Sequence, residues 1–409
     1  MTSAEISTEL PQLPFDQPNA LEVAPEWGLL RAQAPLVDVR TPVGDRVWLV
    51  TRYEAAREIW SDPRFGRSHP EPERAARLSE AAVMGGAADN YATEQADHTR
   101  MRKLLVPAFS AKRMRALEAR VQELVDGCVD DLVAARERAL SDGDGTVDLH
   151  ARLSFPLPVL VICELLGVPF ADRAHFSELS DRMSRLDGGD DAQAARAEFV
   201  AYVGGLAEQK RRDPQPDVIS DLVAAQQADP RFDDLAVAKL ATGLLFAGHE
   251  TTVTRIDYGM VLLLTRPEAY RRLAEEPGSV DGTVEEILRL AAPGGLGVLR
   301  YAHEDVRLGE QRIARGDAVV LSPTAPNRDP AVFERPGEFD PTRSPNPHLG
   351  FGHGAHFCIG ASLARTELRT TVATLARRLP DLRLAVPVDA LELRSSQLTG
   401  GLVALPVRW

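Results

Sequence analysis

The most constraining feature of this 409-residue sequence is a long apolar stretch between Asp233 and Pro267. Asp233 or Asp234 can cap a helix, and a helical pattern then continues to Arg266, just before the proline. The pattern predicts a helix of about 33 residues, roughly 50 Å long at the usual rise per residue. Its middle is apolar on nearly all sides, which is typical of a helix inside the core.

Helical patterns dominate the rest of the chain, and small sheets are expected at both ends. Alternating apolar residues predict strands early and late in the sequence, and spacings of three and four predict further helices. The clearest segments are strands at 36–39 and 47–50, helices at 53–60, 111–139 and 359–379, strands between 298 and 321, and a hairpin around Gly400–Gly401. We find no linker or repeat and expect a single, mainly α-helical domain with small β-sheets over residues 1–409.

Charge and cysteine content exclude several classes of protein. The net charge of −13 argues against a dedicated nucleic-acid binder. Three cysteines do not form a disulfide framework, and two of them, Cys128 and Cys163, fall in apolar segments as core residues would. Residues 1–19 lack the pattern of a signal peptide, and no run reaches the roughly 18 apolar residues that a membrane span needs. We therefore expect a cytoplasmic protein.

The third cysteine, Cys358, lies in the segment Phe351–Gly360, whose sequence is FGHGAHFCIG. A helix is expected directly after it, and a helix N-terminus stabilises a thiolate. Gly354 and Gly360 would allow the backbone to approach a flat cofactor closely, and Phe351 could cover the sulfur. The alternatives are a buried cysteine in a glycine-rich turn, which the full spacing disfavours, and a cysteine protease, for which no oxyanion or orienting group is evident.

A second unusual segment, Ala247–Thr252, places polar groups in the middle of the long apolar helix. An acid and an alcohol in a buried helix need a reason, because unpaired polar groups there cost several kcal/mol. Gly248 would let a ligand lie against the helix backbone. The alternative is a helix kink with Thr251 hydrogen-bonded back to its own helix.

With these motifs the chain resembles the cytochrome P450 family of haem-thiolate monooxygenases, in its soluble bacterial form. Four motifs match in chain order, namely His98–Arg102, Ala247–Thr251, Glu286–Arg289 and Phe351–Gly360. The resemblance implies the cytochrome P450 fold, with haem b between the long helix and the Cys358 loop. It also implies that Cys358 is the iron ligand, whose thiolate favours cleavage of the O–O bond.

The resemblance implies roles for further residues. Glu250 and Thr251 would be the acid–alcohol pair, with Glu250 relaying protons and Thr251 stabilising activated oxygen. His98, Arg102, Arg300 and His356 would hold the haem propionates. The other cofactor-binding residues would be Phe351, Gly360, Ala247 and Gly248. A solvated basic helix is the alternative for the stretch with His98 and Arg102.

Glu286 and Arg289 share a helix face, where such a pair is usually a weak surface salt bridge. In the family the same spacing marks a buried pair that holds the loop before the haem cysteine. The third partner is often an arginine just before the phenylalanine of a later proline-rich stretch. Here Glu338 occupies that position, and Arg343 is a candidate substitute, which leaves the identity of the third partner open.

The implied reaction inserts one oxygen atom from O2 into a C–H or C=C bond, with electrons from NAD(P)H. No flavin or nucleotide-binding motif is evident, so a ferredoxin and its reductase are the expected partners of a monomer. A basic cluster in this acidic chain could dock the ferredoxin, and it comprises Arg100, Arg102, Lys103, Lys112, Arg113 and Arg115. A peroxide-dependent oxidase and a non-enzymatic haem sensor are the alternatives, although neither would need Glu250 and Thr251.

Relatives with this pattern often tailor antibiotics, polyketides or terpenoids, so we expect a bulky lipophilic secondary metabolite as substrate. The predicted pocket residues are Val83, Met84, Leu244, Gly295, Leu296, Val298 and Thr399. Glycines at 294, 295 and 297 would enlarge the wall beside the haem, and His249 or Thr399 could supply polar contacts. Alternatively, these glycines serve only a tight turn after Pro293.

Overall fold

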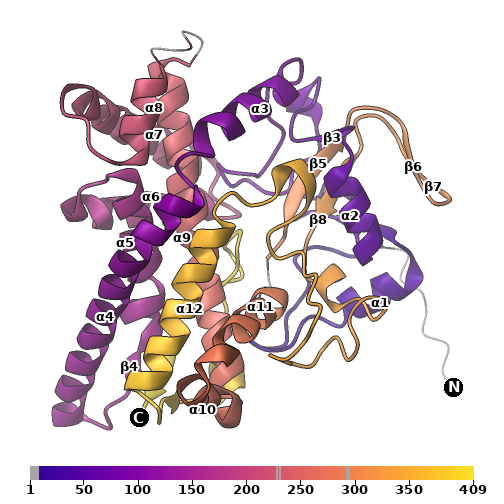
Figure 1. Cartoon of the computed structure of the whole chain (residues 1–409). Coiled ribbons are helices and arrows are strands. Elements are labelled where there is room, and N and C mark those ends of the chain that lie inside the picture. The colour runs from indigo at the N-terminus through magenta and orange to yellow at the C-terminus, as the bar shows by residue number, and fades with distance from the viewer. Residues whose placement is uncertain (1–8, 227–228, 230–231, 292–294) are drawn as a thin grey trace, which may run out of the picture.

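A computed structural model describes residues 9–226, 229, 232–291 and 295–409. The twelve α-helices are α1 (Glu26–Gln33), α2 (Tyr53–Ser61), α3 (Glu94–Leu105), α4 (Ala111–Asp142), α5 (Pro156–Leu166), α6 (Arg173–Ser184), α7 (Gly189–Arg212), α8 (Val218–Ala225), α9 (Asp234–Leu264), α10 (Pro267–Glu275), α11 (Val280–Leu290) and α12 (Ala361–Arg378) among the described residues. Figure 1 shows most of them gathered on one side, with the largest sheet on the other. The predicted mainly helical class is therefore correct.

The strands are short and form three sheets in the part of the chain that the structure describes. They are β1 (Leu36–Arg40), β2 (Arg46–Val50), β3 (Phe65–Gly66), β4 (Val147–Asp148), β5 (Val298–Ala302), β6 (Val306–Leu308), β7 (Gln311–Ile313), β8 (Ala318–Leu321), β9 (Arg383–Leu384) and β10 (Pro406–Arg408). The largest sheet has the order β1-β2-β8-β5-β3, in which β2 and β8 run parallel and the other pairs are antiparallel. The early hairpin was predicted, whereas its pairing with β8 was not.

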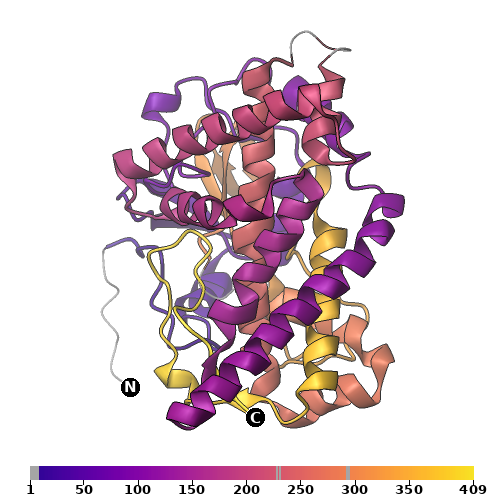
Figure 2. The ribbon, with the colours of Figure 1, turned by 90° about the vertical axis from the view of Figure 1, so that its left-hand side faces the viewer.

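The predicted long helix is present as α9, and its start agrees with the sequence. Asp233 is the N-cap, and its side chain accepts a hydrogen bond from the main-chain N–H of Ala236 at 2.8 Å. Helices α5, α7 and α12 pack against α9. Figure 2 shows α4 and α12 running beside each other along this bundle. The centre of α9 is thereby enclosed by helices from distant parts of the sequence.

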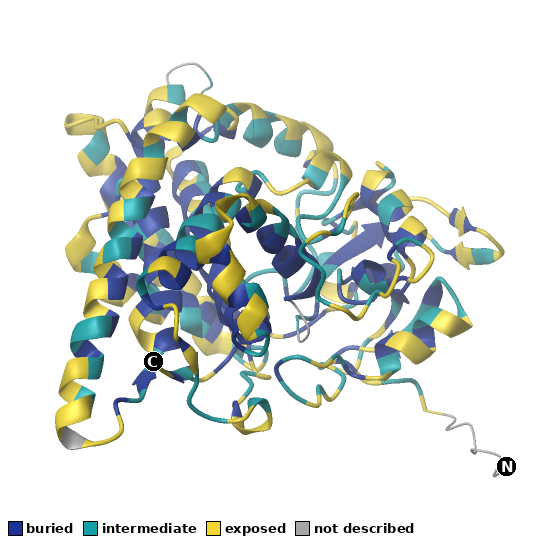
Figure 3. Ribbon diagram, turned by 60° about the horizontal axis from the view of Figure 1, so that its bottom comes forward, coloured by how far each residue is buried: buried dark blue, intermediate teal, exposed yellow. Residues whose placement is uncertain are grey.

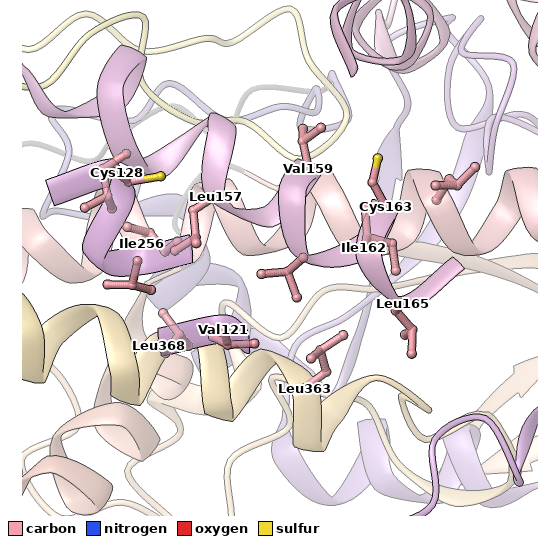
Figure 4. Close-up of a cluster of buried hydrophobic side chains, with 14 of the residues drawn as sticks. Val121, Cys128, Leu157, Val159, Ile162, Cys163, Leu165, Ile256, Leu363 and Leu368 are labelled. Carbon is pink, nitrogen blue, oxygen red and sulfur yellow. The ribbon is translucent and has the colours of Figure 1, made fainter. Parts of the chain in front are cut away.

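The largest hydrophobic core lies between these helices, as the dark blue interior in Figure 3 illustrates. Cys128 and Cys163 belong to it with exposures of 5% and 4%, so their interpretation as core residues is correct. Figure 4 shows both thiols among apolar side chains of α4, α5, α9 and α12. Among the described residues, no helix is both long enough and apolar enough to cross a membrane.

Candidate functional site

From Gly243 onward α9 is buried except along one open face. The residues of this part that keep exposed surface recur at spacings of three and four, and they are Gly243, Leu244, Ala247, Gly248, Thr251 and Arg255. In an α-helix this spacing places side chains on a single face. Thr251 therefore lies on the open face of α9, whereas its neighbour Glu250 points into the protein.

The hydroxyl of Thr251 donates a hydrogen bond to the carbonyl of Ala247 at 2.8 Å. This is the back-bonding that the sequence left as an alternative, although α9 continues as α-helix through this point. Since the single O–H of Thr251 is occupied, its oxygen can still accept a hydrogen bond. In this rotamer Thr251 offers an acceptor to whatever lies on the open face.

Glu250 is 1% exposed, and its Oε1 has no hydrogen-bond partner in the described part of the chain. Burial raises the pKa of this carboxyl, while the nearby Arg394 works in the opposite direction. The hydroxyl of Thr399 faces the carboxyl. Arg394 also pairs with Asp181, whose side chain is 43% exposed. Polar groups thus extend from buried Glu250 to the surface.

His249 does not belong to the open face. It is fully buried, with its ring against Phe155 and Phe176 and its Nδ1 3.4 Å from the hydroxyl of Ser180. Burial lowers the pKa of His249 to about 3, with a smaller contribution from Arg394, so the ring is neutral at pH 7. The suggestion that His249 contacts a substrate is therefore wrong.

Gly248 has a packing role that the sequence did not indicate. A Cβ at this position would lie 2.8 Å from Cδ1 of Ile162, so the glycine allows α5 to pack closely on α9. Gly354 has a similar role, because it has a φ of +68° and its Cβ would lie 2.6 Å from the carbonyl oxygen of Trp60. Neighbouring protein therefore requires both glycines, and their contact with a cofactor stays a prediction.

The Cys358 loop is held in place by main-chain hydrogen bonds. The N–H of Cys358 donates to the carbonyl of Phe351 at 3.0 Å, and α12 begins three residues later, at Ala361. Cys358 keeps exposed surface, but burial by the surrounding protein raises the pKa of its thiol, opposed by the N–H of Gly360 and by nearby arginines. The half-buried ring of Phe351 lies under the guanidinium of Arg365, 4.6 Å away.

A cluster of cationic and imidazole side chains lies beside this loop. The rings of His98 and His356 are 4.0 Å apart, although α3 and the Cys358 loop are distant in sequence. Arg102 donates a hydrogen bond to the carbonyl of Phe357 at 3.0 Å, which joins α3 to the loop. Arg300 is 6% exposed. The predicted set therefore lies together, and the solvated-helix alternative does not describe it.

Electrostatics keep both histidines of this cluster neutral. Burial, with smaller contributions from Arg300 and His98, lowers the pKa of His356 to about 3. Burial, then Arg102 and Arg300, also lowers the pKa of His98. Sequence reasoning missed two members, Arg67 and Glu94, which come from the loop after β3 and the start of α3. The carboxylate of Glu94 accepts hydrogen bonds from the main-chain N–H groups of residues 67 and 68 at 2.6 and 3.0 Å.

Glu286 and Arg289 form a bidentate ion pair in which both side chains are 0% exposed, with N–O distances of 2.6 and 2.8 Å. Nε of Arg343 is 3.4 Å from Oε1 of Glu286, so this candidate substitute occupies the third position. Asn346 adds a further donor to Glu286 at 3.0 Å. The pair is buried, and the surface-bridge interpretation is excluded.

Comparison with known proteins identifies the family. A family model described as Cytochrome P450 matches residues 189–380. The chain is 42% identical to pentalenolactone synthase of Streptomyces exfoliatus, over 98% of this chain and 99% of that protein. It is 38% identical to mycinamicin IV hydroxylase/epoxidase of Micromonospora griseorubida, over the whole of both. The chain belongs to the cytochrome P450 family.

Solved structures agree with this assignment. The fold matches PimD, a cytochrome P450 described as a polyene macrolide antibiotic pimaricin epoxidase, with a TM-score of 0.85, 38% identity, and coverage of 98% of this chain and 100% of that one. It also matches the methyl hydroxylase MycCI of Micromonospora griseorubida, bound to mycinamicin VIII, with a TM-score of 0.87, 32% identity and the same coverage. The chain is accordingly a haem-dependent monooxygenase.

The residues of this cytochrome P450 suit the cofactor of its family. Haem carries two propionate carboxylates and needs an axial ligand for its iron. The cluster of Arg102 and Arg300 with two neutral histidines supplies charge and N–H donors suited to carboxylates. Exposed surface on Cys358 and on the open face of α9 suits a flat group between them.

The predicted pocket residues of the cytochrome P450 are only partly as expected. Leu296 is 2% exposed and packs in a second hydrophobic cluster with Leu398, so it is a core residue rather than a free wall. Gly297 has a φ of +91°, as the tight-turn alternative requires, and Gly294 lies outside the described residues. Gly295 is close to Thr399, since a Cβ there would lie 3.8 Å from the carbonyl oxygen of that residue.

The remaining pocket positions keep some exposed surface. Leu244 lies on the open face of α9, and Val298 is half-buried at the start of β5. Val83 and Met84 pack partly against the second hydrophobic cluster. Met84 has a φ of +59°, which is uncommon for a residue with a side chain.

Proposed function

We propose that this cytochrome P450 oxidises a bulky lipophilic secondary metabolite of macrolide or terpenoid size, and that residues 1–409 form a single domain. The proposal rests above all on the Cys358 loop, which presents a partly exposed thiol directly before α12 and beside the cluster of Arg102 and Arg300. We assign Cys358 as the iron ligand. His98, Arg102, Arg300 and His356 would hold the propionates, and Phe351, Gly360, Ala247 and Gly248 would border the haem.

When bound, haem activates O2 so that one oxygen atom enters a C–H or C=C bond of the substrate. The chain contributes proton control. Because burial raises the pKa of Glu250, its carboxyl can hold a proton close to the open face of α9. Thr399 is close both to this carboxyl and to Gly295. Thr251, the residue after Glu250, offers a hydrogen-bond acceptor on the open face of α9. We infer that Glu250 supplies protons and that Thr251 positions their acceptor.

The substrate assignment rests on the proteins that are similar in sequence and on the exposed apolar surface of this chain. The relatives named pentalenolactone synthase and mycinamicin IV hydroxylase/epoxidase align with nearly the whole chain, as does PimD, which is described as a polyene macrolide antibiotic pimaricin epoxidase. Leu244, Gly295 and Val298 supply apolar or small surface. Thr399 contributes its carbonyl oxygen to this wall, because its hydroxyl oxygen is buried on the side of Glu250.

We further propose that electrons arrive from a ferredoxin that docks on the face formed by the C-terminal end of α3 and the Cys358 loop. Val106 and Phe357 provide exposed apolar surface there, at 57% and 40%. Of the predicted basic cluster, Arg100 is paired with Asp97 at 2.8 Å and Arg113 is paired with Asp221. The exposed cations available to an acidic partner are therefore Lys103, Lys112 and Arg115.

The docking proposal is tested with Lys103→Glu plus Lys112→Glu, measuring the rate of haem reduction by ferredoxin at increasing salt. Electrostatic steering predicts slower reduction in the variant and a weaker salt dependence. Arg138→Glu at the far end of α4 is the control. A reduction rate that changes neither with salt nor in the double variant would contradict the docking site. We also expect a cytoplasmic monomer, which sedimentation and cell fractionation test.

The haem assignment is tested by replacing Cys358 with alanine and recording haem content and the spectrum of the reduced protein with CO. Loss of the thiolate-type absorption band is expected, and an unchanged band would refute the assignment. Turnover with O2, ferredoxin and reductase, compared with turnover by peroxide alone, separates the monooxygenase from a peroxide-dependent oxidase. A haem sensor would show neither reaction.

A further inference from the structure

The open face of α9 ends in a cation. Arg255 lies four residues after Thr251 and is the last residue of α9 on this face, because the residues from Ile256 to Leu264 are buried. Between Gly243 and Thr251 the members of the face are small, apolar or neutral. A guanidinium at the end of an apolar wall is expensive to bury without an anion, so its presence calls for an explanation.

Among the described residues, Arg255 has no acidic partner. Within the described part of the chain its only hydrogen bond joins Nη1 to the carbonyl oxygen of Ala291 at 2.6 Å, and it forms no ion pair. The residues that follow Ala291 and lie outside the described ranges are alanine, proline and glycine, which carry no charge. Burial lowers the pKa of Arg255 to about 10, which still leaves it charged at pH 7.

The contact with Ala291 also fixes where the guanidinium lies. Ala291 ends α11 and begins the connection to Gly295 and β5, close to Thr399. Four further N–H groups of Arg255 remain for a ligand after one is used on Ala291. Arg255 is partly exposed, so a ligand on the open face can reach it.

We propose that Arg255 binds a carboxylate of the substrate, so that this enzyme selects lipophilic acids over the corresponding neutral compounds. The proposal rests on the proposed function, because it requires the haem and the substrate to lie on the open face of α9. The propionates are a second possible source of a carboxylate, but the cluster of Arg102 and Arg300 already suits both of them. A purely structural Arg255 would only anchor the end of α11.

The test uses a series of fatty acids that carry a terminal imidazole, with chains of increasing length, and the methyl ester of each. The imidazole ligates the haem iron of any member of the series and gives a spectral shift, so the affinities of acid and ester are both measurable. For one range of chain lengths the wild-type protein should bind the acid about tenfold or more tightly than the ester, as expected for a charge-assisted hydrogen bond.

Arg255→Gln keeps a donor for Ala291 but removes the charge, and it should reduce the acid-to-ester preference to about twofold or less. Arg255→Lys should keep part of the preference. Arg266→Gln is the matched control, because Arg266 also donates to a main-chain carbonyl, that of Leu262 at 2.9 Å, but lies beyond the open face. Its preference should equal that of wild type.

Equal affinity for acid and ester at every chain length in the wild-type protein would overturn the proposal. So would a preference that persists in Arg255→Gln, or loss of haem from both Arg255 variants, which would assign the residue to a propionate. If neither acid nor ester shifts the spectrum of the wild-type protein, the haem site itself is contradicted, which distinguishes failure of the proposed function from failure of this inference.

Discussion

Replacement of Arg289 by alanine tests how strongly the buried ion pair supports the Cys358 loop. The change leaves Glu286 charged and buried, with 0% of either side chain exposed in the wild-type pair. Arg289 also donates to the carbonyls of Asn327, Pro336 and Glu338 at 2.9, 2.6 and 2.8 Å. Arg289 therefore joins α11 to Asn327 and to the segment 336–338, both of which precede the Cys358 loop.

Removing one partner of a buried ion pair costs about 3–5 kcal/mol in the free energy of unfolding. Each buried carbonyl left without a donor adds about 1–3 kcal/mol, unless Arg343 or water replaces the bond. We therefore expect Arg289→Ala to lower the free energy of unfolding by about 5 kcal/mol or more. A loss of this size approaches the whole stability of many proteins, so little haem-loaded protein should accumulate.

The measurement is urea-induced unfolding of the haem-loaded protein, together with the haem content of the purified variant. Arg335→Ala is the control, because Arg335 pairs with Glu338 at 2.6 Å while both side chains are 58% exposed, and it should cost less than about 1 kcal/mol. Replacing both members, as in Glu286→Leu with Arg289→Met, should be less harmful than Arg289→Ala because no unpaired charge remains. Normal haem content and a loss below about 1 kcal/mol in Arg289→Ala would refute the argument.

Three further predictions follow from single contacts. Thr251→Ala should consume NAD(P)H but release mostly peroxide, whereas Thr251→Ser should form product, and measured coupling decides this. Gly354→Ala should cost about 1–3 kcal/mol and lower haem content, because φ is +68° and a carbonyl lies 2.6 Å from the new Cβ, whereas Gly309→Ala, with open space, should only add strain. Burial acts to raise the pKa of Glu285, but hydrogen bonds, first from Arg365, lower it to about 2. Glu285 therefore stabilises the fold above its unfolded pKa near 4.5. Above that pH, Glu285→Gln should have a lower Tm than the wild-type protein, and the difference should disappear as the pH falls from about 4.5 to 2.

The sequence predicted those parts of the site that depend on local spacing. The apolar run and its Asp233 cap predict α9, and the segment around Cys358 predicts a loop that leads into a helix. Arg343 could be suggested as the third partner of Glu286 because it lies close to the expected position in the chain. These features need only the order of residues along one or two elements.

Features that depend on packing between distant segments were missed. Gly248 faces Ile162 of α5, and no local pattern indicates which helix crosses at that point. Arg67 and Glu94 come from a stretch without regular periodicity, so nothing in the sequence connects them to Arg300. The parallel pairing of β2 with β8 has the same origin, since the two strands are more than 260 residues apart.

The polar residues of α9 show how one helix separates two tasks. Glu250 and Thr251 are adjacent, so the helical rotation between them places the carboxyl inside the protein and the hydroxyl on the open face. Burial can raise the pKa of Glu250 only because it faces inward, and Thr251 can meet a ligand only because it faces outward. One turn later Arg255 returns to the open face as a charge without an acidic partner among the described residues. If all three assignments hold, proton supply, oxygen chemistry and recognition of a substrate anion are ordered along about one and a half turns of a single rigid helix.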